Sequence, residues 1–372
     1  MEISNKNPIL VMVVDDSAVV RGLISRMLEK DSSIDVVDTV SNGEIAVKRA
    51  QTLDLDVIIL DIEMPVMDGL TALPKILEIN PNVKVIMAST LTMKNAEISL
   101  KALQAGASEY IAKPSTSREM TGGQDFEHQL REKVKALGAD RPVRDGGSPT
   151  AAKKAAKAKA IPKKPTAPIT LKPHPITHPK PKSLVIGSST GGPQALFELF
   201  KGLNGKINVP IVVTQHMPPT FTTILAQHIT RSTGTPAAEA QDGDSLEPGK
   251  ILVAPGDYHM LLKEQNGETV VKLNQDPPVN YCRPAVDPMI ESAVKIYGKK
   301  TFGVILTGMG YDGRNSCKAL VEAGGTVYAQ DEATSVVWGM PGAVAEAGIC
   351  SAVLPLTDLA PKIVEFFSKG VG

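Results

Sequence analysis

Three aspartates lie where two short apolar segments of the N-terminal third end. Asp15 and Asp16 follow residues 9–14, and Asp61 follows residues 57–60. If these segments are parallel strands of one sheet, their carboxyl ends meet at one edge and the carboxylates converge. Like charges about 4 Å apart cost roughly 1–4 kcal/mol per pair, and a divalent cation offsets this repulsion. Because hard oxygen ligands suit Mg²⁺, we predict a Mg²⁺ site at which an aspartate attacks a phosphorus atom.

Two further segment ends supply groups that such a site needs. Ser89 or Thr90 ends one apolar segment and offers a hydroxyl group to a phosphoryl oxygen. Lys113 ends the next segment and can pair with the phosphoryl charge, and a cis peptide bond before Pro114 would aim its side chain. Aspartates at strand ends can also be ordinary loop residues or helix caps, but the match at five positions favours the site.

A turn of small residues in the second half of the chain predicts an exposed nucleophile. Gly187, Ser189 and Gly191 satisfy the pattern G-x-S-x-G between an apolar segment and a stretch with helical spacing. The amino end of the following helix favours a developing negative charge at the turn. Taken alone the pattern is a weak signal, because turns of this composition also cradle phosphates.

A histidine and an aspartate follow two other apolar segments, so they should share the sheet edge of Ser189. We expect His216 to take the proton of Ser189, and Asp312 to hold the imidazole tautomer and stabilise its positive form. Glycines around Met309 leave its backbone N–H free to donate to an oxyanion, and Thr190 is expected at the same place.

The elements that position these residues alternate between strands and helices. Short apolar segments recur between stretches with helical spacing, which indicates βα units and parallel sheets covered by helices. Residues 1–125 predict a flavodoxin-like α/β domain with a five-stranded parallel sheet. Residues 183–372 predict a doubly wound, mostly parallel α/β domain. A hairpin around residues 267–273 would make the second sheet mixed.

Residues 126–182 separate the two domains with a helical end and a linker rich in Pro, Lys and Ala. Residues 141–182 hold eleven basic side chains, one acidic side chain and nine prolines. This composition favours an extended or disordered spacer. We interpret His174 and His178 as solvated residues of that linker.

The composition argues against several classes of protein. The formal net charge is zero, so nothing global points to a nucleic-acid partner. Cys282, Cys317 and Cys350 are widely spaced, so we expect neither a disulfide framework nor a zinc site, and a reducing cytoplasm fits best. We find no signal-peptide pattern and no apolar run long enough to span a membrane.

Residues 9–114 resemble the receiver domains of two-component response regulators. The matching stretches are Val-Val-Asp-Asp-Ser, Leu-Asp-Ile-Glu-Met-Pro-Val-Met-Asp-Gly and Ala-Lys-Pro. The resemblance implies that Asp61 accepts a phosphoryl group from a histidine kinase. It also implies that Ser89, Tyr110 and Lys113 form the switch that responds to phosphorylation.

Residues 183–367 resemble the catalytic domain of the CheB-type chemotaxis methylesterases. Four motifs occur in the family's order: Ile-Gly-Ser-Ser-Thr-Gly-Gly-Pro, Gln-His-Met-Pro, Ile-Leu-Thr-Gly-Met-Gly-Tyr-Asp-Gly and Ala-Gln-Asp-Glu-Ala-Thr-Ser-Val-Val-Trp-Gly-Met-Pro. Their order of Ser, His and Asp differs from that of the common α/β-hydrolases. Ser188 stands where the family usually has alanine, so Ser188 has to be distinguished from Ser189 as the nucleophile. Arg283 is either a substrate contact or a surface arginine.

The resemblance implies a phosphorylation-activated enzyme. The family removes methyl groups from glutamate side chains on chemoreceptor cytoplasmic helices, releasing methanol, and deamidates specific glutamines. Both reactions are acyl transfers, for which the hydrolase needs no cofactor. Two alternatives remain: a receiver-linked hydrolase of another ester, and a DNA-binding response regulator, which would need a small basic output domain.

Overall fold

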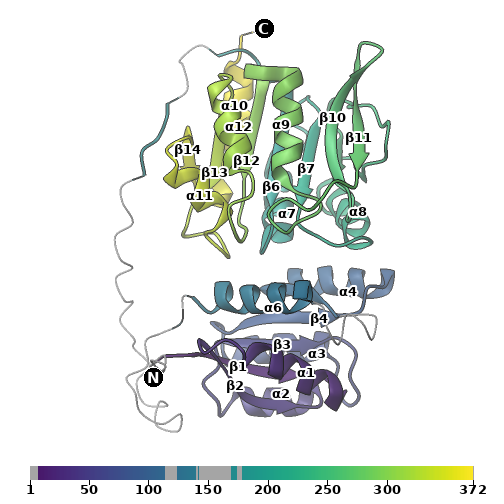
Figure 1. Ribbon diagram of the computed structural model, residues 1–372, viewed down its shortest axis with the longest axis vertical. Helices are drawn as coiled ribbons and strands as arrows, with labels where there is room; N and C mark the ends of the chain where they lie inside the picture. The colour runs from purple at the N-terminus through teal and green to yellow at the C-terminus, as the bar shows by residue number, and fades with distance from the viewer. Residues whose placement is uncertain (1–6, 114–123, 140, 142–168, 174–177, 372) are drawn as a thin grey trace. The chain divides into compact units, whose positions relative to one another are not determined.

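The computed structural model describes residues 7–113, 124–139, 141, 169–173 and 178–371. Contacts within the chain divide it into two compact units, Met1–Pro165 and Thr166–Gly372. Figure 1 follows the chain through both units, and each unit has its own large sheet.

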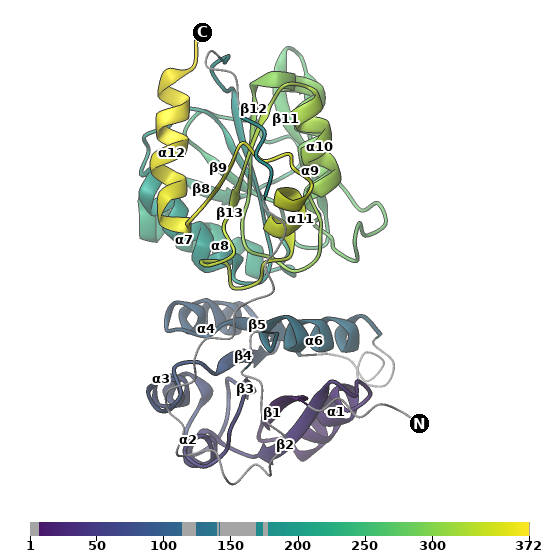
Figure 2. The same cartoon turned by 90° about the vertical axis from the view of Figure 1, so that its left-hand side faces the viewer.

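The first unit is a five-stranded sheet with helices on both faces. All its strand pairs are parallel, in the order β2-β1-β3-β4-β5. Figure 2 shows α1 and α6 on one side of the strands and α2, α3 and α4 on the other. The flavodoxin-like prediction is confirmed. The elements are β1 (Ile9–Val14), α1 (Ala18–Leu28), β2 (Ile34–Val40), α2 (Gly43–Ala50), β3 (Val57–Asp61), α3 (Gly69–Ile79), β4 (Lys84–Ser89), α4 (Met93–Gln104), β5 (Glu109–Ala112) and α6 (Gln124–Leu137).

The central strands β1 and β3 are apolar up to the aspartate that ends β3, because helices cover both faces of the sheet. Every residue of β1 and of β3 is buried, which is typical of a parallel sheet. Four helices begin with a side-chain oxygen that accepts a backbone N–H three residues later. These caps are Ser17, Asn42, Asp68 and Thr92. The strand ends therefore lead into capped helices at the edge where the aspartates lie.

The second unit is built on a seven-stranded sheet in which every pair is parallel, in the order β14-β13-β12-β6-β7-β9-β8. The chain runs from β6 to its neighbour β7 on one side, and from β12 to its neighbour β13 on the other. The gap between β6 and β12 is therefore a topological switch point, where α/β sheets place their sites. The strands are β6 (Ser183–Ser188), β7 (Ile211–Gln215), β8 (Ala237–Glu239), β9 (Ile251–Val253), β12 (Thr301–Ile305), β13 (Thr326–Gln330) and β14 (Ala352–Leu354).

Helices cover both faces of the seven-stranded sheet, as Figure 2 shows: α7, α8 and α12 lie on one side and α9, α10 and α11 on the other. The helices are α7 (Gly192–Leu203), α8 (Phe221–Thr233), α9 (Val286–Tyr297), α10 (Arg314–Glu322), α11 (Met340–Glu346) and α12 (Leu356–Lys369). This arrangement confirms the predicted doubly wound fold.

An antiparallel hairpin forms a separate two-stranded sheet. It pairs β10 (His259–Gln265) with β11 (Glu268–Asn274). Both turn residues have positive φ, 52° at Asn266 and 82° at Gly267, a geometry that suits two-residue hairpins. The expectation of a mixed large sheet is therefore wrong, because the two hairpin strands pair only with each other and pack on α9.

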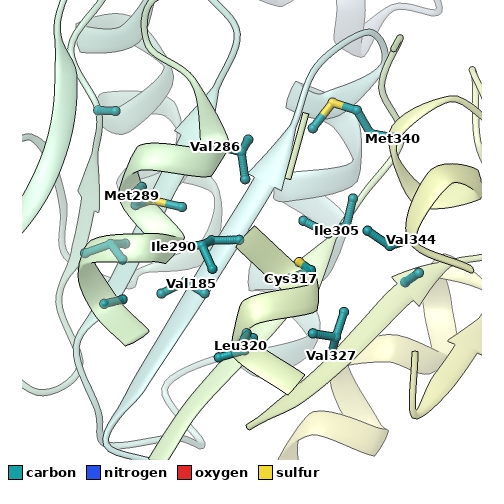
Figure 3. Close-up of a cluster of buried hydrophobic side chains, with 14 of the residues drawn as sticks. Val185, Val286, Met289, Ile290, Ile305, Cys317, Leu320, Val327, Met340 and Val344 are labelled. Atoms are coloured by element: carbon teal, nitrogen blue, oxygen red, sulfur yellow. The ribbon is translucent and has the colours of Figure 1, made fainter. Parts of the chain in front are cut away.

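A cluster of buried apolar side chains joins the sheet to the helices on one face (Figure 3). Met289 and Ile290 of α9 and Leu320 of α10 pack over strand residues such as Val185 and Ile305. These side chains are fully buried, and burying each contributes roughly 1.5–3 kcal/mol. The cluster fixes α9 and α10, whose preceding loops carry parts of the site.

Part of the expected linker packs on the second unit. His178 is buried and stacks on Phe366 of α12 with ring centroids 3.6 Å apart. Lys180 donates its N–H to Val371 O at 2.9 Å. The interpretation of His178 as solvated is wrong, because α12 offers it an aromatic face. His174 lies outside the described residues.

Among the described residues, no helix is both long and apolar enough to cross a membrane.

Candidate active site and phosphoacceptor site

The three predicted aspartates converge at the edge of the first sheet. Asp15, Asp16 and Asp61 each offer an oxygen atom within 4.8 Å of the others. Lys113 Nζ lies 2.6 Å from Asp15 Oδ2 and 2.6 Å from Asp61 Oδ1. One lysine against three carboxylates leaves an excess of negative charge, and the ligands are all hard oxygens. The residues therefore fit a divalent cation such as Mg²⁺.

Asp61 is buried, and its pKa is raised to about 6. Burial is the largest cause, because it disfavours the charged form. Lys113 opposes the shift, whereas the charge of Asp15 adds to it. A cavity of about 280 Å³ opens beside Asp61 and is bordered by Asp16, Ser89, Thr90 and Lys113. The predicted phosphoacceptor therefore faces a space that its predicted partners line.

The predicted switch residues Ser89 and Tyr110 contact α4 and α6. Ser89 Oγ lies 3.1 Å from Ser99 Oγ of α4, and Tyr110 is buried with Lys133 Nζ 5.6 Å from its ring centroid. Burial also raises the pKa of the Tyr110 hydroxyl well above its ordinary value. The peptide bond before Pro114, predicted as a cis candidate, lies outside the described residues.

In the second unit, the hydroxyl groups of the two candidate serines differ in their hydrogen bonds. Ser188 Oγ donates to Gln215 Oε1 at 2.7 Å, and Gln215 Nε2 donates to the carbonyl oxygen of Ser189 at 2.9 Å. Gln215 thus holds the turn and occupies the Ser188 hydroxyl. In the described part of the chain, no hydrogen bond ties Ser189 Oγ to another protein group.

Glycines make the tight turn that follows Ser189 possible. Gly191 has φ of 75°, and a Cβ there would lie 2.5 Å from Val336 Cγ2. Gly192 N–H donates to the carbonyl oxygen of Ser189 at 2.7 Å, and α7 begins at this residue. The amino end of α7 therefore lies at the serine, where it favours negative charge.

His216 and Asp312 form the pair that the sequence predicts. His216 Nε2 lies 2.7 Å from Asp312 Oδ2. The carboxylate accepts four more hydrogen bonds, from Asn280 Nδ2 at 3.2 Å, Val286 N at 2.6 Å, Asp287 N at 3.2 Å and Gly313 N at 3.0 Å. Burial opposes ionisation, but these donors and His216 hold the pKa of Asp312 below its ordinary value. The carboxylate therefore stays charged and takes the Nε2 hydrogen.

The other ring nitrogen of His216 faces a cysteine. Cys282 Sγ lies 3.3 Å from His216 Nδ1. Burial disfavours the imidazolium, but the contacts with Cys282 and Asp312 outweigh it and raise the pKa of His216 to about 10. An imidazole with this pKa is largely protonated at neutral pH, whereas a general base must be neutral.

The structure places Ser189 and His216 after adjacent parallel strands, β6 and β7. Their backbones are close, since His216 N–H donates to the carbonyl oxygen of Ser188 at 3.1 Å. Among the described residues, no hydrogen bond joins Ser189 Oγ to the imidazole. His216 and Asp312 are therefore in contact, while Ser189 lies next to them without a hydrogen bond from its Oγ to the imidazole.

The loop after β12 lies against Ser189. A Cβ on Gly308 would lie 2.9 Å from Ser189 Cβ, and Gly308 N–H donates to Val337 O at 3.1 Å. In the described part of the chain, the N–H of Met309 has no acceptor, and the buried Thr190 Oγ1 has no partner. Both groups are therefore unused hydrogen-bond donors close to Ser189 in the sequence or in the fold.

The sequence pattern did not indicate the roles of Gln215, Asn280 and Cys282. Gln215 stands next to His216, which was a usable signal, whereas Asn280 and Cys282 belong to an irregular segment without periodicity. Arg283 donates to Asp257 Oδ1 at 2.6 Å and to the carbonyl oxygens of residues 275 and 276. Its guanidinium therefore braces two loops.

Both units match known families. Residues 184–363 match the model described as CheB methylesterase, and residues 11–122 match the response regulator receiver domain. A Rhodospirillum rubrum protein named protein-glutamate methylesterase/protein-glutamine glutaminase 1 is 56% identical over 97% of this chain and 96% of its own. An Azospirillum brasilense protein named protein-glutamate methylesterase/protein-glutamine glutaminase is 54% identical, and the match covers 98% of this chain and 94% of that protein.

Among solved structures, the catalytic domain of the Thermotoga maritima CheB methylesterase is 44% identical. The match covers 50% of this chain and 98% of that domain, with a TM-score of 0.49. The two relatives named above match over nearly their whole length, which includes the receiver and the hydrolase unit in the same order. The chain therefore belongs to the CheB methylesterase family, with a receiver domain ahead of the methylesterase domain.

Proposed function

We propose that this chain is a phosphorylation-activated serine hydrolase of the cytoplasm. Its substrates are glutamate methyl esters, and specific glutamines, on the cytoplasmic helices of chemoreceptors. The observation that carries the proposal is the His216–Asp312 hydrogen bond of 2.7 Å beside the turn that presents Ser189. The names of the relatives, which are protein-glutamate methylesterases and protein-glutamine glutaminases, support the substrate.

In the proposed reaction, His216 acts in its neutral form, in which Asp312 binds the Nε2–H and Nδ1 carries the lone pair. Nδ1 takes the proton of Ser189 as Oγ bonds to the substrate carbonyl carbon and the π electrons move to oxygen. Met309 N–H, with the Thr190 hydroxyl nearby, donates to that oxyanion. The intermediate then expels methanol, or ammonia from glutamine, with the proton returned by His216. Water hydrolyses the resulting Ser189 ester by the same steps.

The test is an assay of methanol release from receptor membranes methylated with a radiolabelled methyl group. We expect release by the wild-type chain that depends on Ser189, His216 and Asp312. Hydrolysis of a simple nitrophenyl ester without any release from receptors would instead indicate a hydrolase with another substrate.

We propose that a histidine kinase phosphorylates Asp61 in the receiver. Asp15, Asp16 and Asp61 would hold Mg²⁺, which would supply charge compensation for the phosphoryl oxygens. Lys113 is placed to pair with the phosphoryl group, and Ser89 to donate its hydroxyl. Ser89 and Ser99 are in contact, so a movement of Ser89 towards the phosphoryl group would break a link to α4.

Asp61→Asn should abolish phosphoryl incorporation from a small-molecule phosphodonor, because the amide cannot act as the nucleophile. Removal of Mg²⁺ by a chelator should do the same for the wild-type chain. Incorporation is measured by the mobility shift of the phosphorylated form in a phosphate-affinity gel. Asp68→Asn is the matched control, since Asp68 caps α3 and asparagine caps equally well. Undiminished incorporation into Asp61→Asn would place the phosphoacceptor elsewhere.

Removal of residues 1–165 should raise the methylesterase rate of the remaining chain above that of the unphosphorylated full-length protein. The cut follows the boundary of the second compact unit and keeps His178 on Phe366. An increase of about 5–150-fold is the range expected for coupling between two sites. Rates are compared on one preparation of methylated receptor membranes, with and without the phosphodonor. A truncated chain no faster than the unphosphorylated protein would show that the receiver does not restrain the hydrolase.

A further inference from the structure

The segment of residues 279–283 is built to hold a thiol against the histidine. Val279 and Cys282 exchange two backbone hydrogen bonds, at 3.1 and 2.9 Å. Asn280 and Tyr281 between them have positive φ, 52° and 63°, and Arg283 anchors the segment to Asp257. Asn280 Nδ2 also bonds to Asp312 Oδ1. These contacts therefore hold the backbone of Cys282 beside His216.

This thiol contacts the nitrogen that catalysis needs. Asp312 takes Nε2 of His216, so Nδ1 is left to accept the proton of Ser189. Cys282 Sγ lies 3.3 Å from that same Nδ1. Because the pKa of His216 is raised to about 10, the shared proton lies on Nδ1 and the sulfur accepts it. The lone pair of Nδ1 is therefore engaged, and Ser189 has to compete for it.

We propose that Cys282 is a positioning residue that occupies Nδ1 of His216 in the resting enzyme, so that the base engages Ser189 only when this contact is released. The proposal rests on the proposed role of His216 as the base. It adds a competing partner that keeps the hydrolase at less than its full activity.

The charged groups around His216 decide whether loss of Cys282 raises or lowers the pKa of the imidazole. Among the residues that the structure describes, two titratable groups contact the ring: Asp312 from the loop after β12, and Cys282 from the segment before α9. Asp287 of α9 lies behind Asp312. Both contacts raise the pKa of His216. Loss of Cys282 should therefore lower this pKa and leave more neutral base at any pH below it.

The first experiment follows the ring nitrogens of His216 by NMR in the full-length chain labelled with ¹⁵N-histidine. The chain has six histidines, and a His216→Gln sample assigns the signal. In Cys282→Ala the imidazole should titrate at lower pH than in the wild type. Cys282→Ser, whose hydroxyl can still bond to Nδ1, should titrate closer to the wild type. Cys350→Ala is the matched control, because Cys350 is buried in the core cluster, and it should leave the titration unchanged.

The second experiment measures the pH dependence of kcat on methylated receptor membranes. In Cys282→Ala, the rising limb of kcat should move to lower pH by the same amount as the NMR titration, with KM unchanged. Well below the limb, kcat should then rise about tenfold for each pH unit of movement. A merely structural role would lower kcat and leave the pH profile in place.

Three results would overturn the proposal: a His216 titration that is the same in Cys282→Ala and the wild type, a limb that does not move, or a folded Cys282→Ala protein without turnover. The last would make the thiol essential. The NMR result needs no substrate, so it stands or falls separately from the proposed methylesterase activity.

Discussion

Replacement of Ser189 by alanine is expected to lower kcat for methanol release by about 10⁴–10⁶. Without Oγ no acyl-enzyme ester can form. The oxyanion donors and the binding surface remain, so a small residual rate is expected. The measurement is methanol release from methylated receptor membranes, with substrate binding checked by competition against the wild-type enzyme.

Ser188→Ala is the matched control, because it removes a hydroxyl group one residue away. This hydroxyl donates to Gln215 Oε1 at 2.7 Å and is buried. Its loss leaves the buried amide oxygen without that donor, which should lower the free energy of unfolding by about 1–3 kcal/mol. We expect kcat to stay within about tenfold of the wild type. If Ser188→Ala were inactive and Ser189→Ala active, the nucleophile would be Ser188.

The sequence was sufficient to predict the residues that follow strand ends. In a parallel α/β sheet, every strand end points to one edge, so an apolar segment followed by Asp61, His216 or Asp312 predicts where that side chain lies. Apolar runs also located the main strands, because strands buried on both faces are apolar throughout. This is why the parallel strands of both large sheets were largely predicted from pattern alone, whereas the separate place of the hairpin was not.

The sequence was insufficient where contacts depend on irregular backbone. Cys282 reaches His216 across 66 positions, through a segment whose conformation depends on two residues with positive φ. The segment shows no hydrophobic periodicity from which the direction of the Cys282 side chain could be predicted. His178 was misjudged for a related reason, since its neighbours suggest a solvated linker while its environment is set by Phe366, far along the chain.

Asp312→Asn should lower kcat by about 10⁴. The carboxylate accepts five hydrogen bonds, one of them from His216 Nε2, and an amide can replace only part of them. Its NH₂ group would face N–H donors, and its oxygen would not stabilise the imidazolium. Because Asp312 raises the pKa of His216, the rising limb of the pH profile should also move to lower pH.

Asp287→Asn separates this effect from general damage to the site. Asp287 is the adjacent buried carboxylate, and its side chain accepts the N–H of Ser316 at 3.0 Å rather than contacting the imidazole. Burial raises the pKa of Asp287, so its neutral amide analogue should be tolerated with a loss of kcat below about tenfold. Thermal unfolding of both variants shows whether each is folded at the assay temperature. If the two variants lost activity equally, Asp312 would serve the packing of the loops, and orientation of His216 would have to come from elsewhere.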